Sequence, residues 1–461
     1  MFLKRSLKPC FDEVEETNGD EEFHVWVKLV LGLKPELALF VASRREGGGG
    51  TAEYEGFAKG AFNVTFRFSF NDGAPDVIIR FPKPGHTATV YRDEKVANEV
   101  QVMECLRENT DIPIPRIHSW GLTAEGPHGL GPFIIMDVVD GVLLSSILNH
   151  PDKKGIGFLL NPDLDMSILD KVYHQIARYM IQLSQLTFSR IGAISKDDAT
   201  GTWSVTGRPL TYNMNELRAV TNYPEGQFPT APFDRASDYF RSVANVHLTH
   251  VWTQRNIAYD PEEAQLRFIA RHRMAQLIPK YCADDSGPFT PFCDDMRPSN
   301  MLVDPETLRI TGVIDWEFTN AMPAQFSYDP PWWLLLTGPE SWLDRYAMEE
   351  FLILYEPRLE QFLRALEHVE TEAALEGKQA SGPPLSSRMR ESWKTRQFWF
   401  DYAVRNSFEG DSVYWAALHE GGPGIELLDD KARAELEPFT QKKMEQLKVY
   451  REDCRVRYET K

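Results

Sequence analysis

The chain between residues 57 and 140 is patterned as short strands, whereas most of the rest is patterned as helices. Val64–Phe70 alternates apolar and polar residues and runs into Asn71–Gly73, a strong turn signal, and Val77–Phe81 follows as a second apolar run. A period of two with an intervening turn predicts an antiparallel β-hairpin. Two further strands are expected at Ile117–Gly121 and Phe133–Asp137.

Helical spacing of apolar residues begins within this strand-rich region and continues after Gly141. Arg92–Arg107 predicts a helix because Val96, Val100, Met103 and Leu106 form one apolar stripe. Met166–Leu186 shows the same spacing over a longer stretch, which predicts a core helix.

The amino-terminal region carries a different pattern. Residues 1–22 are strongly charged and are expected to be disordered, whereas Glu22–Leu33 and about Pro35–Arg45 have helical spacing. Gly47–Gly50 follows without a preceding strand or a subsequent Gly-Lys-Ser/Thr. We therefore interpret these glycines as a flexible linker rather than as a phosphate-binding loop.

A second hairpin is predicted near residue 300, and it brings polar side chains together. The apolar runs Met301–Val303 and Ile310–Ile314 are separated by the turn-prone segment Asp304–Thr307. A hairpin places its outer ends side by side, so Asn300 and Asp315 should be neighbours, with Asp295 on the loop just before them. Two oxygen ligands beside a free carboxylate suit Mg-dependent phosphoryl transfer. The alternative is an Asx-rich turn without chemistry.

These residues resemble the catalytic segment of the aminoglycoside phosphotransferase-like, or choline-kinase-like, family of small-molecule kinases. The family has a loop of the form His-Gly-Asp-x-x-x-x-Asn followed by Ile-Asp-Trp-Glu; the matching positions are Asp295, Asn300 and Ile314–Glu317. The resemblance extends from about Gly56 to about Phe408. It implies ATP and Mg²⁺ as cofactors, Asp295 as the catalytic base, and Asn300 and Asp315 as the metal ligands.

The resemblance also implies an α+β, two-lobed protein-kinase-like fold. A small antiparallel β lobe with one key helix, residues 56–140, would bind the nucleotide. A large, mainly helical lobe, residues 141–461, would carry the catalytic loop (292–300) and the metal-binding hairpin (300–317). Residues 1–55 would form a charged, helical extension with its glycine linker.

Further nucleotide-binding residues follow from the same resemblance. The turn containing Gly60, Phe62 and Asn63 would cover the phosphates through its backbone N–H groups. Arg80 would hold the α- and β-phosphates, with Lys83 as the rival cation. Glu99 would pair with Arg80, the alternative being a solvated helix glutamate. The adenine would meet backbone groups near Met136 and Val138.

Three positions in the catalytic loop need separate consideration. The family's His and Gly are replaced by Cys293 and Asp294. A thiol is a weak hydrogen-bonding group, and Asp294 puts a second carboxylate beside Asp295, which favours a raised pKa. Arg297, two residues after Asp295, either neutralises charge on the transferring phosphoryl group or is a surface arginine paired with an acid.

Composition narrows the classes of partner. Fifty Lys and Arg against 68 Asp and Glu give a formal net charge of −18, which argues against nucleic acid and against an anionic membrane surface. The five cysteines have no CxxC spacing, so neither a disulfide framework nor a zinc site is indicated. No apolar run is long enough to span a membrane, and no targeting segment is evident. We expect a cytoplasmic protein.

The predicted function is therefore transfer of the γ-phosphoryl group of ATP to a hydroxyl of a small molecule. One alternative is a weak or inactive kinase-like pseudoenzyme that binds nucleotide or protein, which Cys293 and Asp294 would favour. A protein kinase is disfavoured, because GxGxxG, His-Arg-Asp and Asp-Phe-Gly are missing from the sequence. The aromatic residues within Arg388–Trp415 are expected to be core rather than the wall of a cation site.

Overall fold

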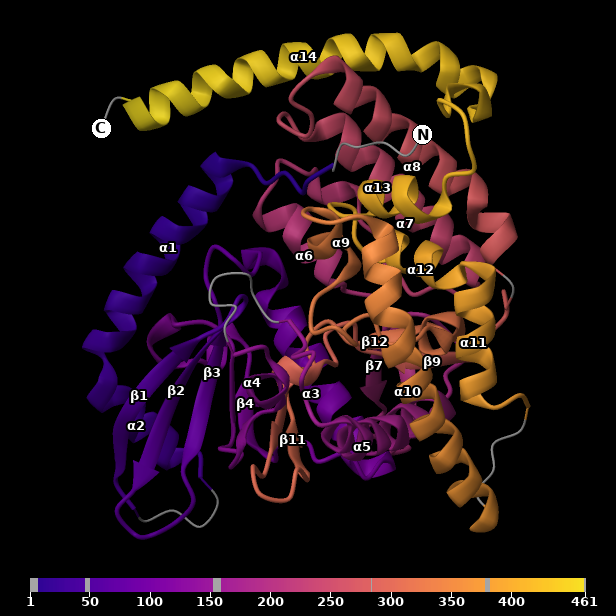
Figure 1. The fold of residues 1–461 in the computed structure, drawn as a ribbon. Coiled ribbons are helices and arrows are strands. Elements are labelled where there is room, and N and C mark those ends of the chain that lie inside the picture. Colours follow the sequence, from indigo (N-terminus) through magenta and orange to yellow (C-terminus); the bar gives the residue numbers. More distant parts are fainter. Residues whose placement is uncertain (1–6, 46–49, 152–158, 283, 378–381, 460–461) are drawn as a thin grey trace.

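The computed structural model describes residues 7–45, 50–151, 159–282, 284–377 and 382–459, and Figure 1 shows its two lobes. The helices are α1 (Glu13–Gly32), α2 (Lys34–Ser43), α3 (Arg92–Asn109), α4 (Leu144–Leu148), α5 (Met166–Gln185), α6 (Tyr212–Ala219), α7 (Ala236–Thr253), α8 (Pro261–Tyr281), α9 (Pro339–Leu343), α10 (Met348–Leu375), α11 (Leu385–Thr395), α12 (Gln397–Arg405), α13 (Gly410–Val413) and α14 (Asp430–Glu459). The strands are β1 (Ala52–Lys59), β2 (Asn63–Phe70), β3 (Val77–Pro82), β4 (Ile117–Gly121), β5 (Phe133–Asp137), β6 (Val142–Leu143), β7 (Ala193–Lys196), β8 (Trp203–Gly207), β9 (Phe289–Phe292), β10 (Met301–Val303), β11 (Ile310–Val313) and β12 (Asn320–Pro323).

The amino-terminal lobe is built on a five-stranded antiparallel sheet of order β1-β2-β3-β5-β4. Alternation along β2 and β3 sends side chains such as Phe66 and Ile79 to one face of the sheet, where they pack with residues of α1 and α2. Ile134 and Met136 of β5 join the other core cluster, which contains the apolar stripe of α3. The sheet is therefore covered by helices on both faces, and the predicted α+β architecture is confirmed.

The expected disorder of residues 1–22 is wrong for the part that the structure describes. Helix α1 begins at Glu13, where the Asp12 side chain accepts hydrogen bonds from the backbone N–H groups of Val14 and Glu15. Acidic residues in the first turn complement the positive end of the helix dipole, and Asp12 also pairs with Arg255 at 3.1 Å. The charges that suggested disorder thus form a helix start, and most of the expected Gly47–Gly50 linker lies outside the described residues.

The carboxy-terminal lobe is mainly helical and carries the second predicted hairpin. Strands β10 and β11 pair antiparallel, with Met301 opposite Val313, and β6 extends this pair to a three-stranded sheet. The predicted hairpin is confirmed. Because Ile314 N also donates to Asn300 O at 2.9 Å, the ladder continues to the two residues that flank the strands.

The connection between the lobes rests directly on this hairpin. Thr311 Oγ1 donates to the backbone oxygen of Asp140 at 2.6 Å. Gly141 has a φ of +136°, and a Cβ there would lie 2.7 Å from Val303 O, so only glycine lets the connection approach so closely. The hairpin therefore lies beside the junction of the two lobes.

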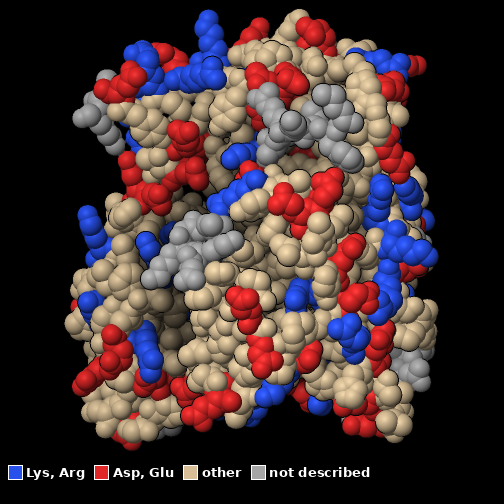
Figure 2. All heavy atoms as spheres, in the orientation of Figure 1, with Lys and Arg blue, Asp and Glu red and all other residues tan. Residues whose placement is uncertain are grey.

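Most aromatic residues of the segment Arg388–Trp415 are core, as expected: Phe398, Trp399 and Phe400 are all buried. Tyr402 differs, because it is partly exposed and lines a cavity between the lobes. Within the described residues, no helix combines the length and the apolar character that crossing a membrane requires. On the face of the molecule in Figure 2, acidic and basic side chains are intermingled over the surface.

Candidate active site

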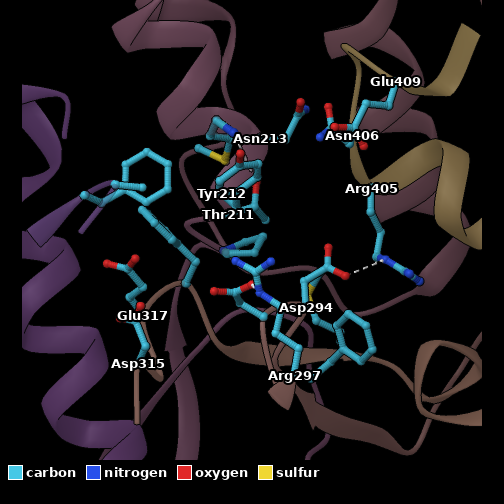
Figure 3. Close-up of a pocket in the computed structure, with 18 of the residues that line it drawn as sticks. Thr211, Tyr212, Asn213, Asp294, Arg297, Asp315, Glu317, Arg405, Asn406 and Glu409 are labelled. Carbon is cyan, nitrogen blue, oxygen red and sulfur yellow. Dashed lines mark hydrogen bonds and ion pairs between the residues drawn. The ribbon is translucent and has the colours of Figure 1, made fainter. Parts of the chain in front are cut away.

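A cavity of about 620 Å³ lies between the β1–β2 turn of the small lobe and the hairpin and helices of the large lobe. Nearly all of the predicted catalytic and phosphate-end residues line it: Gly60, Phe62, Asn63, Arg80, Asp295, Arg297, Asn300 and Asp315. Figure 3 shows Asp315 and Glu317 near one end and Asn406 and Glu409 near the other, with Asp294 and Arg297 between them. The predicted phosphate-end residues and a group of acidic residues thus lie at different ends of one cavity.

Asp295 is held by two neighbours in its own loop. Asn300 Nδ2 donates to Asp295 Oδ2 at 2.6 Å and to Asp295 O at 2.9 Å. Arg297 Nε lies 2.6 Å from Asp295 Oδ1, so Arg297 faces the site and pairs with the predicted base. Burial is the main cause that raises the pKa of Asp295, and Arg297 and Asn300 oppose it. A carboxylate that is partly exposed to the cavity and fixed in direction suits a general base.

Asp315 follows the hairpin in a left-handed backbone conformation, with φ of +67°. Its Oδ1 lies 3.3 Å from Arg80 Nη1 and 3.5 Å from Asn63 Nδ2. Burial and then the nearby Glu317 carboxylate raise the pKa of Asp315 well above its ordinary value. A bound cation would stabilise the carboxylates of Asp315 and Glu317, since two negative charges close together with little solvent around them are costly.

The donor set fits Mg²⁺. The Nδ2 group of Asn300 donates to Asp295, so the Oδ1 atom of Asn300 points in another direction and is left for a cation. Asp315 contributes a carboxylate oxygen. Carbonyl and carboxylate oxygens are the ligands that Mg²⁺ takes, together with water and phosphate oxygens. Asn300 and Asp315 are thus brought together as the sequence predicts.

The predicted partnership of Arg80 and Glu99 is present as a buried ion pair between β3 and α3. Burial works against the charged guanidinium, yet the carboxylates of Glu99 and Asp315 prevail and raise the pKa of Arg80. The rival cation, Lys83, instead lies with Nζ 4.7 Å from the ring centre of Phe23 on α1, and it is not among the residues that line the cavity.

Sequence reasoning missed Lys95 altogether and named Glu317 only as part of the Ile314–Glu317 match, without a role. Lys95, on α3, lies with Nζ 2.5 Å from Glu317 Oε2 and 2.8 Å from Asn63 Oδ1. Asn63 Nδ2 in turn donates to Glu317 Oε2 at 2.8 Å. The only available signal was that Lys95 stands four residues before Glu99 and so on the same face of the helix. The three side chains join the small lobe to the large lobe at the phosphate end.

The β1–β2 turn is positioned by aromatic contacts and by backbone hydrogen bonds. The ring of Phe62 meets the rings of Tyr212 and Phe318 edge-on, with centroids 5.4 and 5.9 Å apart. Gly60 N donates to Asn63 O at 2.8 Å, which closes the turn. Met136 and Val138, the predicted adenine neighbours, lie at the end of β5 and just after it and do not line this cavity. Their role stays a prediction.

The unusual pair Cys293 and Asp294 is accommodated in two different ways. Cys293 Sγ lies 3.9 Å from Asp315 O, and burial raises the pKa of the thiol, so it fills space without becoming a nucleophile. The Asp294 carboxylate turns away from Asp295 to Arg405 Nε, at 3.3 Å. Asp294 is only a minor cause of the raised pKa of Asp295, and burial is the dominant one.

Arg405 links Asp294 to the core of the large lobe. Its Nη1 lies 3.2 Å from Asp329 Oδ2, and Trp332 Nε1 donates to Asp294 O at 3.0 Å. Two side chains from outside the loop, on α12 and after the hairpin, therefore fix the residue beside the predicted base. We interpret Arg405 as the brace of this loop.

The far end of the cavity is acidic. Tyr402 donates to Glu340, and Tyr212 donates to Glu216 Oε1 at 2.5 Å. Burial, reinforced by Glu340 and Glu216, raises the pKa of Glu409 well above its ordinary value. Carboxylates gathered in one low-dielectric place favour a bound cation or a shared proton.

A family model and a curated relative each match part of this chain. Residues 220–371 match the model of the phosphotransferase enzyme family. A curated relative, clavilactone A biosynthesis cluster protein Y of Ampulloclitocybe clavipes, is 26% identical over 285 residues, which are 59% of this chain and 62% of that protein. The match thus spans less than two thirds of the relative's length.

Solved structures are similar at low identity. A Ralstonia eutropha protein described as a candidate aminoglycoside phosphotransferase is 16% identical, with 90% of this chain and 97% of that chain covered and a TM-score of 0.43. An aminoglycoside phosphotransferase in complex with AMP-PNP and hygromycin B is 14% identical, with 88% and 98% covered and a TM-score of 0.41. The Plasmodium vivax ethanolamine kinase is 9% identical, with 87% and 82% covered and a TM-score of 0.39.

The family match lies on the same segment as the catalytic loop and the hairpin, which carry the resemblance seen in the sequence. Over residues 220–371 this chain is thus similar to the phosphotransferase enzyme family.

Proposed function

We propose that this protein transfers the γ-phosphoryl group of ATP, in the presence of Mg²⁺, to a hydroxyl group of a small molecule. The observation that carries the proposal is the convergence of Asp295, Asn300 and Asp315 on one cavity. A fixed carboxylate beside two oxygen ligands is the arrangement that phosphoryl transfer to an alcohol requires.

Each residue has a role that follows from its contacts. Arg80, held by Glu99, is placed to bind the phosphates next to Asp315. Asn300 and Asp315 would hold Mg²⁺, which neutralises charge on the phosphates when bound. Asp295 accepts the proton of the acceptor hydroxyl as that oxygen bonds to the γ-phosphorus, while the bond from this phosphorus to the bridging oxygen breaks and ADP leaves with the electron pair. Arg297, beside Asp295, offers a guanidinium to the phosphoryl oxygens.

The acceptor class follows from the other end of the cavity. Glu340 and Glu409 line it beside Tyr402 and Asn406, and the balancing cation there, Arg405, is already engaged by Asp294 and Asp329. A protonated amine would relieve the repulsion among these carboxylates. We therefore propose a hydroxyl-bearing amine as the acceptor.

The pseudoenzyme alternative is not favoured. Its support was the replacement of the family's His and Gly by Cys293 and Asp294. Asp294 is held by Arg405 and Trp332, and Asp295 keeps its contacts to Asn300 and Arg297. A second set of contacts thus holds the loop that the missing histidine would brace.

Formation of ADP from ATP and Mg²⁺ across a panel of amino alcohols and aminocyclitols tests the proposal, with uncharged polyols of matched size as the control panel. We expect turnover with hydroxyl-bearing amines, loss of turnover in Asp295→Ala, and a higher KM for the amine in Glu409→Gln. Turnover with polyols alone would contradict the acceptor class. No phosphorylated product with either panel, despite ATP binding, would contradict the proposed activity.

A further inference from the structure

A cluster of three metal-binding side chains lies outside the cavity, where α5 meets α10. His174 comes from α5, and His368 and Glu372 come from α10, four residues apart on one face of that helix. His174 Nε2 lies 3.4 Å from Glu372 Oε2, and His368 Nε2 lies 3.3 Å from Glu372 Oε1. One ligand atom from each residue falls within a group no wider than 4.8 Å.

The two helices hold these side chains on rigid supports. The rings of Tyr173 and Phe362 pack edge-on, with centroids 5.4 Å apart, and Gln361 Nε2 donates to Asp170 Oδ1 at 2.7 Å. The core faces of both helices are thus locked close to the cluster, while its own side chains are partly exposed and have room to adjust to an ion. Ligands on packed helices are positioned more accurately than ligands on loops.

The spacing fits a tetrahedral ion with nitrogen and oxygen ligands. Zinc–nitrogen and zinc–oxygen bonds of about 2.0–2.1 Å at tetrahedral angles separate two ligand atoms by roughly 3.3–3.4 Å. The two His–Glu distances have this length but end on different oxygens of Glu372, so binding through a single carboxylate oxygen requires a small adjustment of these partly exposed side chains. Two histidines and a glutamate form a known type of zinc ligand set, which leaves a fourth position for water.

We propose that His174, His368 and Glu372 bind a divalent ion of the zinc class. The ion links α5 to α10 in the large lobe. Its effect reaches the hairpin, because Gln175, next to His174, accepts from Ile310 N at 2.8 Å and donates to Leu308 O at 2.9 Å. The site is separate from the predicted Mg²⁺ ligands and does not depend on the proposed activity.

The test is zinc binding to the full chain after treatment with a chelator and desalting. Competition with a chromogenic zinc chelator measures affinity, and metal analysis after dialysis measures stoichiometry. The variants are His174→Ala, His368→Ala and Glu372→Gln, and the matched control is His24→Ala, an exposed histidine on α1. Thermal unfolding with ZnCl₂ or MgCl₂, without nucleotide, provides a second readout.

We expect one tightly bound zinc ion in the wild-type protein and in His24→Ala. Each cluster variant should weaken this binding by more than about 100-fold, because even outer-shell partners of a metal contribute about 10–100-fold. Zinc at about 100 times its Kd should raise Tm by roughly 3 °C in a chain of this size, and MgCl₂ should not. The absence of tight binding, or tight binding that survives in all three variants, would overturn the proposal and leave ordinary His–Glu ion pairs.

Discussion

Lys95 of the small lobe and Glu317 of the large lobe meet directly where the two lobes join, with Nζ 2.5 Å from Oε2. Both side chains are nearly inaccessible, at 0% and 7% exposure. The pair is joined by Asn63 from the β1–β2 turn, so side chains from both lobes share one polar network.

Breaking this pair should destabilise the protein strongly. We expect Lys95→Met to lower the free energy of unfolding by about 3–5 kcal/mol, because Glu317 is left as an uncompensated buried charge. Urea unfolding measures the change, with Lys28→Met on the exposed face of α1 as the control. Adding Glu317→Gln to Lys95→Met should recover part of the loss; an equal or greater loss in the double variant would contradict the pairing.

Asp295→Asn should separate chemistry from binding. Removal of a general base lowers rates by about 10²–10⁴, so kcat should fall by that factor while the Kd for ATP with Mg²⁺ stays nearly unchanged. Steady-state kinetics with the best amine of the panel and calorimetric ATP titration measure the two quantities. Glu306→Gln, exposed in the hairpin turn, is the control. A variant that keeps wild-type kcat would remove Asp295 from its role.

Much of this arrangement could be predicted from local sequence, because it depends on neighbours in the chain. The apolar runs on either side of Asp304–Thr307 predicted the hairpin, and the hairpin placed Asn300 beside Asp315. Helical spacing predicted α3, and the family resemblance implied that Glu99 on it pairs with Arg80.

What was missed depends on contacts between distant segments. Arg405 lies more than 100 residues from Asp294 in sequence, and nothing in its neighbourhood marks it as a partner of the catalytic loop. Lys95 looks like an ordinary surface charge until the lobes are assembled, and Glu317, although part of the Ile314–Glu317 match, gives no sign of its partner in the sequence. The acids near the amino terminus suggested disorder, because the local sequence does not reveal the partner of their helix cap. That cap, Asp12, is stabilised by Arg255 from the other lobe.

Arg405 provides a test of the brace. Arg405→Met leaves Asp294 and Asp329 without their common partner. We expect kcat to fall at least about tenfold, because a small displacement of a catalytic group lowers the rate strongly. The KM for ATP should stay nearly unchanged. A double-mutant cycle with Asp294→Asn should give a coupling of about 0.5–3 kcal/mol in activation free energy. Measurements are made well below the Tm of the least stable variant, and strictly additive effects would contradict the brace.

Glu216 should make stability depend on pH. Burial raises the pKa of Glu216 to about 7, and the hydrogen bond from Tyr212 opposes this. A raised folded-state pKa means that the stability contribution is fully present below the unfolded pKa of about 4.5 and is lost as pH rises through about 7.

Glu216→Gln should therefore be more stable than the wild type at pH 8, by about 1–3 kcal/mol, and the difference should shrink towards pH 4.5. Chemical unfolding across this range measures it, with the exposed Glu225→Gln as the control. A difference that does not change with pH would assign the effect to packing instead of to titration.

The central claim, a working nucleotide–metal site, is tested most directly by thermal unfolding with ATP, with and without Mg²⁺, in the wild type and in Asp315→Ala. ATP at about 100 times its Kd should stabilise the wild type by roughly 2.7 kcal/mol. The account predicts a rise in Tm that requires Mg²⁺ and disappears in Asp315→Ala. A wild-type Tm that does not respond to millimolar ATP and Mg²⁺, or a Mg²⁺-dependent rise that persists in Asp315→Ala, would contradict it.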